Sequence, residues 1–224
     1  MMKKYCVYLR WDYPSLIILS ILLSIVSGCK EKPVSPFSKS AEEALSTFEL
    51  TPGFKIELIA SEPLIIDPVA MTIDESGRMY VVEMAGMPLN KSGVGKVILL
   101  SDTSHDGKMD KSTVFADSLV LPSGIMRWKK GVLVTDPPNV YYMEDTNGDG
   151  KSDIKILLLT GFDTSNLEGN VNNPIYGLDN WIYLASLPVI TGGNIHYADD
   201  SSAERLEEGS IRFRPDRHEI ETIS

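Results

Sequence analysis

Short runs of apolar residues recur along the chain from residue 45 onward, with turn-forming residues between them. Several of these runs alternate apolar and polar positions, which is the period of a half-buried strand. No amphipathic helix of useful length follows Leu50. The pattern therefore predicts an all-β fold. The expected strands lie within residues 68–82, 95–100, 112–115, 122–134, 140–143, 154–159, 174–184 and 209–214.

Three of these segments repeat at a nearly constant spacing. Residues 68–82, 122–134 and 174–184 each contain a proline, a strand, a turn and a second apolar strand. With the runs between them, each repeat holds about four strands, which is typical of a β-propeller blade. A β-sandwich is the alternative architecture, but sandwiches do not repeat their strand order at a fixed period.

The chain is too short for a closed ring of such blades. About three four-stranded blades fit, together with the beginning of an edge at 209–214, whereas closed propellers have four to eight blades. We expect residues 45–224 to be the N-terminal part of a propeller of about six blades. Alone, three blades expose their edges and need a partner or further chain to close the ring.

The first 28 residues have the three parts of a secretory signal: a basic start, an apolar run and small residues before Cys29. The apolar run, 15–27, is shorter than the roughly 20 residues that cross a bilayer as a helix. Residues 26–29 resemble the bacterial lipobox, in which the cysteine carries a diacylglycerol. We expect an exported lipoprotein, anchored through a lipid on Cys29 to a bacterial membrane, on its periplasmic side or at the cell surface. An ordinary signal peptide or an uncleaved anchor is the alternative.

Residues 29–44 are rich in proline, serine and mixed charge and have no apolar period, so they are predicted to be a flexible tether. Cys6 leaves with the signal, and Cys29 alone cannot form an intramolecular disulfide. The formal net charge of −10 argues against a nucleic-acid partner, because such proteins cluster Lys and Arg.

Two acidic loops have the spacing of calcium ligands. In 145–153, oxygen side chains occupy the first, third, fifth and ninth positions, with a glycine at the sixth. This spacing matches the start of an EF-hand loop, but the twelfth position is Ile156 and no helix pair flanks it. The predicted ligands are Asp145, Asn147, Asp149 and Asp153.

The earlier loop, 102–110, repeats the pattern with a serine in place of the asparagine, which makes it the weaker candidate. Its predicted ligands are Asp102, Ser104, Asp106 and Asp110. The alternative for both loops is that Asn-Gly and Asp-Gly pairs serve only as hairpin turns. Calcium would be structural here and would staple the loop tips.

Several collinear blocks resemble one family. They lie at 47–64, 67–70, 77–84, 111–117 and 177–183. Together they are similar to the membrane-bound dehydrogenase family first described in Planctomycetes and Verrucomicrobia. The resemblance implies a propeller similar to the glucose and sorbosone dehydrogenases, which use pyrroloquinoline quinone. In longer members it implies a helical region and a c-type cytochrome domain that accepts the electrons.

The chain departs from this pattern where a base is expected. Before the block at 177–183 the family has a basic residue or histidine, but residues 166–174 contain neither. Glu168 is the candidate catalytic base there, by position alone. The three histidines, His105, His196 and His218, are expected to be surface or packing residues. Packing between blades is also expected of the strand residues Arg127, Trp128, Tyr176 and Trp181.

Other motifs are absent. There is no Cys-x-x-Cys-His for covalent haem, no Gly-x-Gly-x-x-Gly, no Gly-x-Ser-x-Gly and no zinc spacing. These absences argue against haem in this chain and against dinucleotide, esterase and zinc-hydrolase functions.

Three functional hypotheses remain open. The first is a quinone-dependent dehydrogenase that oxidises a sugar, polyol or aldehyde. The second is a non-catalytic, calcium-stabilised propeller that binds glycans or protein partners at the cell surface. The third is a calcium-dependent hydrolase with carboxylates gathered at the central axis, for which Glu83 and Asp136 lie near strand ends.

Overall fold

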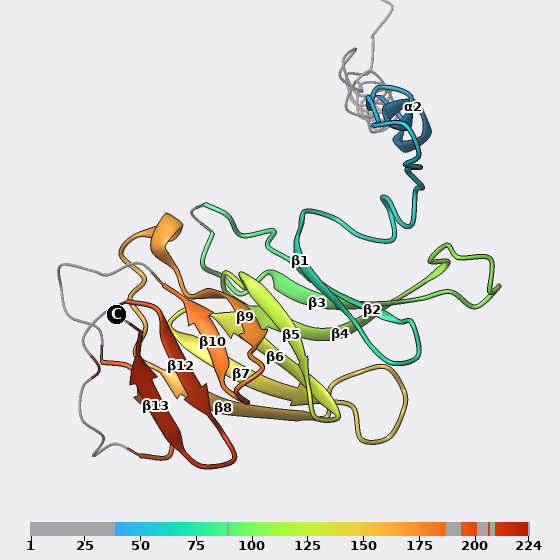
Figure 1. The fold of residues 1–224 in the computed structure, drawn as a ribbon. Coiled ribbons are helices and arrows are strands. Elements are labelled where there is room, and N and C mark those ends of the chain that lie inside the picture. Colours follow the sequence, from blue (N-terminus) through green and yellow to red (C-terminus); the bar gives the residue numbers. More distant parts are fainter. Residues whose placement is uncertain (1–38, 89, 187–193, 201–205, 207–208, 224) are drawn as a thin grey trace, which may run out of the picture. The chain divides into compact units, whose positions relative to one another are not determined.

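The structure is a computed structural model that describes residues 39–88, 90–186, 194–200, 206 and 209–223. The described chain is all-β, as the apolar period predicts, and consists mainly of three antiparallel sheets (Figure 1). None of the three sheets closes on itself. The sheets all lie in one compact unit that begins at Leu50.

The first sheet runs in chain order from β1 to β4. Its strands are β1 (Pro68–Ile73), β2 (Met79–Glu83), β3 (Gly95–Ser101) and β4 (Lys111–Leu119). Each strand pairs antiparallel with the next, so the sheet is a simple meander. These strands coincide with the apolar runs predicted at 68–82, 95–100 and 112–115.

The second sheet repeats the meander and adds a short outer strand. Its strands are β5 (Gly124–Trp128), β6 (Gly131–Asp136), β7 (Asn139–Glu144), β8 (Ile154–Thr160) and β11 (His196–Tyr197). β11 comes from later in the chain and pairs with β8. The sheet therefore has five strands rather than the four expected.

The third sheet has the order β9-β10-β12-β13. Its strands are β9 (Asn172–Tyr176), β10 (Ile182–Ala185), β12 (Ile211–Arg214) and β13 (Glu219–Thr222). The run predicted as the beginning of an edge is β12, and it pairs with β10 inside this sheet.

Two short helical turns complete the described elements. The α-helix α2 (Ala41–Leu45) begins at a capping box, in which Ser40 and Glu43 each accept the backbone N–H of the other. It lies in the described part of the predicted tether. The 3-10 helix η1 (Leu167–Gly169) precedes β9.

The strand β6 of the second sheet is buried on both faces. In β6, Val132 and Val134 pack in a cluster with the first sheet, whereas Leu133 between them packs in a cluster with the third. All three are fully buried. Successive side chains of a strand point to opposite faces, so an uninterrupted apolar run is what a strand between two sheets needs.

The first strands of the three sheets lie side by side, since β5 contacts both β1 and β9. The approach of β5 to β9 is close at Gly124, where a Cβ would come within 2.8 Å of the Pro174 ring and 2.9 Å of the Asn173 nitrogen. Ser123 joins the same two strands by donating its hydroxyl proton to the Val171 carbonyl at 2.6 Å.

In two of the sheets, a carboxylate at the end of the second strand accepts backbone hydrogen bonds from the segment that precedes the first strand. Glu83, at the end of β2, accepts the Ile66 N–H at 2.7 Å. Asp136, at the end of β6, accepts the N–H groups of Val120 and Leu121 at 2.8–3.1 Å. In the third sheet Ser186 follows β10 and contacts the Gly169 carbonyl at 3.4 Å.

Both carboxylates are buried, and burial raises the pKa of Asp136, an effect that the two backbone donors oppose. Each therefore serves the backbone of its own sheet. Glu83 and Asp136 do not join a group of three metal-ligating side chains among the described residues. The calcium-dependent hydrolase stays a prediction.

Replacing Asp136 by alanine should destabilise the fold by about 1–3 kcal/mol, because two buried backbone N–H groups lose their acceptor. Urea unfolding measures the change. The matched control is Asp117→Ala, which removes an exposed carboxylate from β4 and should change the free energy of unfolding by less than about 0.5 kcal/mol. Equal effects of the two variants would contradict the structural role of Asp136.

Candidate functional site

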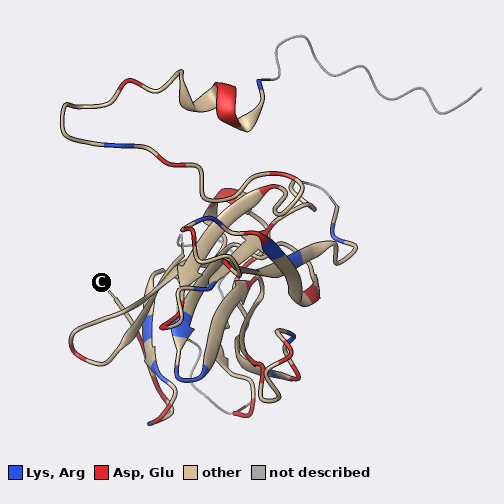
Figure 2. Cartoon of the chain, turned by 90° about the vertical axis from the view of Figure 1, so that its right-hand side faces the viewer, with Lys and Arg blue, Asp and Glu red and all other residues tan. Residues whose placement is uncertain are grey.

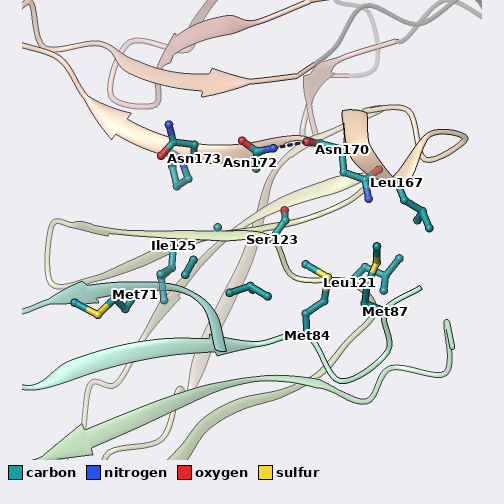
Figure 3. Close-up of a pocket in the computed structure, with 14 residues that line it drawn as sticks. Met71, Met84, Met87, Leu121, Ser123, Ile125, Leu167, Asn170, Asn172 and Asn173 are labelled. Carbon is teal, nitrogen blue, oxygen red and sulfur yellow. Dashed lines mark hydrogen bonds between the residues drawn. The ribbon is translucent and has the colours of Figure 1, made fainter. Parts of the chain in front are cut away.

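A hollow lies where β1, β5 and the stretch leading into β9 come together (Figure 3). We call it the inner groove, and its volume is about 610 Å³. Most of its walls are apolar: Val69, Ala70, Met71, Met84, Met87, Leu121, Gly124, Ile125, Leu167 and Pro174. Its polar side chains are uncharged: Ser123, Asn170, Asn172 and Asn173.

Asn170 has an unused hydrogen-bonding atom at this groove. The residue is only 7% exposed, and its Oδ1 has no hydrogen-bond partner among the described residues. Figure 3 shows its side-chain amide pointing toward the groove, while its backbone carbonyl accepts the Asn172 Nδ2 proton at 2.9 Å. A buried polar group without a partner costs folding free energy, so its presence in a native protein calls for an explanation.

The two ends of an amide have almost the same shape, so a rotation of the side chain presents either the donor or the acceptor to the groove. A hydroxyl group both donates and accepts, and it matches either orientation. The groove therefore offers the unpartnered Asn170 amide, two further asparagines, one serine hydroxyl and extended apolar walls to a bound molecule.

Charged side chains are missing from the described lining of the inner groove. Glu168, the candidate base, lies in η1 beside Leu167, but its side chain is exposed and it does not line the groove. Its position follows from the local turn, because Asn166 caps η1 by accepting the Glu168 N–H at 3.0 Å. The structure thus gives Glu168 no contact that recommends it as a catalytic base.

The second acidic loop, 145–153, connects β7 to β8 and is closed by its own hydrogen bonds. Asp145 accepts the N–H groups of Gly148 and Gly150 at 2.7 and 2.8 Å, and Asp153 accepts from Thr146. Partial burial opposes ionisation of Asp145, but these backbone donors hold its pKa below the ordinary value.

The remaining oxygens of this loop also face backbone donors. Asn147 accepts the Asp149 N–H, and Asp149 accepts the Lys151 N–H. The loop is also fixed to the first sheet, since the Ser152 N–H donates to the Phe115 carbonyl at 2.7 Å. It therefore bridges the first and second sheets.

The first acidic loop, 102–110, occupies the same place between β3 and β4. Asp102 accepts the N–H groups of Gly107 and His105, and Asp110 accepts those of Thr103 and Ser104. Backbone donors, led by Gly107 for Asp102 and by Thr103 for Asp110, lower the pKa of both carboxyls.

The remaining predicted ligands of this loop are engaged locally as well. The Ser104 hydroxyl donates to Asp102 at 3.3 Å, and Asp106 accepts the Lys108 N–H at 2.9 Å. The loop also contacts the segment before β1, because the Met109 N–H donates to the Ile59 carbonyl. In both loops the predicted ligands come together, but no group of three metal-ligating Asp, Glu, His or Cys side chains occurs in the described part of the chain.

Acidic and basic side chains concentrate in the turns and at strand ends, and the strand bodies are largely uncharged (Figure 2). Cys29 and the predicted signal peptide, 1–28, lie outside the described residues. Among the residues that the structure describes, no helix has the length and apolar character to cross a membrane.

Of the four residues expected to pack between blades, Arg127 contacts a neighbouring sheet, whereas Trp128 and Trp181 have ring contacts within their own sheets. Arg127 pairs with Glu75 at 3.0 Å, Trp128 meets Tyr142 edge to face, and the guanidinium groups of two arginines lie over the Trp181 ring. The expectation is wrong for Tyr176, which is 52% exposed.

Sequence reasoning missed Asn170 and Ser123. The only sequence signal was the density of asparagines in 166–174, a stretch that drew attention for the base it lacks. Whether an asparagine is buried without a partner depends on how distant strands approach one another, and this is not written in the local sequence.

The comparisons with known proteins identify a family and no individual relative. Residues 40–224 match the family described as "Domain of unknown function (DUF7133)". Among curated proteins, none matches the chain. Because the match covers most of the chain, the protein belongs to the DUF7133 family.

Proposed function

We propose that the three sheets are successive blades of a β-propeller and that the inner groove binds an uncharged, hydroxyl-bearing small molecule of the sugar or polyol class. Three features support the propeller. Each sheet is a meander in chain order, the sheets pack face to face, and their first strands lie side by side. In a propeller the first strands surround the central channel, and a full ring would hold about six such sheets.

The observation that carries the ligand proposal is Asn170. Its buried amide has an unpartnered atom at a groove whose described lining contains no charge. Methionine and aliphatic walls suit the C–H faces of a sugar ring, and a ligand hydroxyl completes the hydrogen bonding of the amide. An ionic ligand would be desolvated there without a counter-charge.

The groove does not fit pyrroloquinoline quinone. That cofactor carries several carboxylates, and the described lining supplies no Arg, Lys or His to pair with them. The lining also contains no titratable side chain that accepts a proton from a substrate hydroxyl. The dehydrogenase activity and the transfer of electrons to a c-type cytochrome, both implied by the resemblance, stay predictions. Of the hypotheses open from the sequence, the groove favours the glycan-binding module.

Calcium at the acidic loops is part of the same proposal. The predicted ligands converge within each loop, and each carboxylate oxygen that accepts one N–H keeps a second lone pair. Calcium would bind Asp145, Asn147, Asp149 and Asp153, and more weakly Asp102, Ser104, Asp106 and Asp110. Because loop 145–153 is hydrogen-bonded to the first sheet, an ion there would strengthen the joint between two sheets.

We further propose that the protein is exported and held at a bacterial membrane by a lipid on Cys29. The support is the sequence at 1–29. A lipid anchor places the inner groove outside the cytoplasm, where sugars released from polymers are available.

The substitution Asn170→Leu should separate binding from stability. It removes a buried acceptor without a partner, so the free energy of unfolding should stay unchanged or rise by about 1 kcal/mol, while binding of neutral sugars and polyols is lost. Calorimetric titration with a panel of such compounds, followed by urea unfolding, measures both. If Asn170→Leu destabilises the protein by about 2 kcal/mol and the variant still binds these compounds, Asn170 is structural.

Millimolar calcium should raise the melting temperature by about 2–4 °C for each kcal/mol of binding linkage. Asp145→Asn should remove most of this increase, and Asp102→Asn should remove less. Differential scanning calorimetry with calcium and with a chelator checks this, and Asp117→Asn serves as the control on a strand. The same melting temperature with calcium and chelator would mean that the loops are turns closed by backbone donors alone.

Cys29→Ser should release the protein from the membrane fraction and abolish metabolic labelling by a fatty-acid analogue. Cys6→Ser, a cysteine change inside the predicted signal, should leave both unchanged. Labelling that survives in the Cys29→Ser variant would contradict the lipoprotein proposal.

A further inference from the structure

A second pocket lies at the opposite end of the strands that form the inner groove. β5 and β9 contribute their first residues to the groove and their last residues, Trp128 and Tyr176, to this pocket. The turns after β9 and β12 complete it with Asn180, Arg214, Asp216 and Arg217. Its volume is about 280 Å³, enough for one small ring. We call it the arginine pocket, and it shares no lining residue with the inner groove.

The arginine pocket holds positive charge that the protein does not neutralise. Arg217 is exposed, and its side chain has no ion pair or hydrogen bond to the described residues. Asp216, the acidic residue of the pocket, is already paired with Lys129. One guanidinium therefore faces the pocket without a counter-charge from the described chain.

Arg214 adds a second guanidinium to the pocket wall, and the protein holds this group in place. Its Nη2 donates to the Asp179 carbonyl at 2.9 Å and its Nη1 lies 3.4 Å from Glu219. Its Nε is buried and has no acceptor among the described residues. The group rests on the Trp181 ring at 4.3 Å, which fixes its plane.

Aromatic and amide groups form the rest of the pocket. Trp128 is held edge to face against Tyr142, with the Lys129 ammonium over its ring at 4.3 Å. Tyr176 is half exposed, and its hydroxyl donates to Asn180 Oδ1 at 3.2 Å. This bond orients the Asn180 amide, so that its Nδ2 protons remain available to a ligand.

We propose that the arginine pocket binds an acidic sugar of the uronic acid class. A carboxylate pairs with Arg217, because the planar fork of this free guanidinium matches a carboxylate, and Arg214 lies beside it in the pocket wall. The C–H face of the sugar ring packs on Tyr176, and a ring hydroxyl accepts a proton from Asn180. A charged sugar fits this end of β5 and β9, as a neutral one fits the inner groove.

Calorimetric titration of the full chain with glucuronic acid tests the proposal, with glucose and sulfate as the matched neutral sugar and simple anion. We expect glucuronic acid to bind to Asn170→Leu, in which the inner groove has lost its amide, and glucose not to bind to that variant. Arg217→Gln should lower the affinity for glucuronic acid roughly tenfold or more, because a charge-assisted hydrogen bond is lost. Tyr176→Ala should also lower the affinity for glucuronic acid, but it should leave any binding of sulfate unchanged.

Both substituted residues are exposed, and circular dichroism should show that the variants remain folded. Binding of glucuronic acid that survives Arg217→Gln and Tyr176→Ala would overturn the site. If sulfate binds as tightly as glucuronic acid, and if Tyr176→Ala does not change the affinity for sulfate, the ligand is a simple anion and the proposal of a sugar is overturned. Failure of glucose to bind to any variant would count against the inner groove alone.

Discussion

The structure depends on burying both faces of the second sheet. Val132, Leu133 and Val134 of β6 are fully buried and pack alternately on the first and third sheets. Such an apolar run is buried completely only when a sheet packs on each side of the strand, because a strand in a two-layer sandwich has one face in solvent. The face-to-face stack brings the first strands β1, β5 and β9 together at the inner groove, and the far ends of β5 and β9 contribute to the arginine pocket.

Carboxylates at repeated positions hold this stack by accepting backbone protons. Glu83 and Asp136 secure the entries to β1 and β5, and Asp102 and Asp145 close the loops between the last two strands of their sheets. Buried backbone N–H groups need such acceptors where the chain leaves a strand and no neighbouring strand supplies a carbonyl. The acidic composition is thus explained in part by architecture. The chemistry offered to ligands falls instead to amides in the groove and to guanidinium groups in the pocket.

The strands and their grouping were predictable because they follow from local period and spacing. The acidic loops were predictable for the same reason, since ligand spacing is local. β11 was not predictable, because His196–Tyr197 is a two-residue strand whose partner, β8, is far away in the sequence. Asn170 and Arg214 escaped prediction because tertiary packing decides whether a buried polar atom finds a partner. Glu168 was chosen by sequence position, and its exposure depends on the turn of η1.

The proposed function depends on the inner groove, where a neutral sugar or polyol would bind. A crystal structure of the chain soaked with a neutral polyol tests it most directly. The account predicts a ligand between β1, β5 and β9, with one hydroxyl about 2.7–3.0 Å from the amide of Asn170 and its carbon chain against the methionine walls. A polyol bound elsewhere, or a groove that holds only water at a saturating concentration, would contradict it.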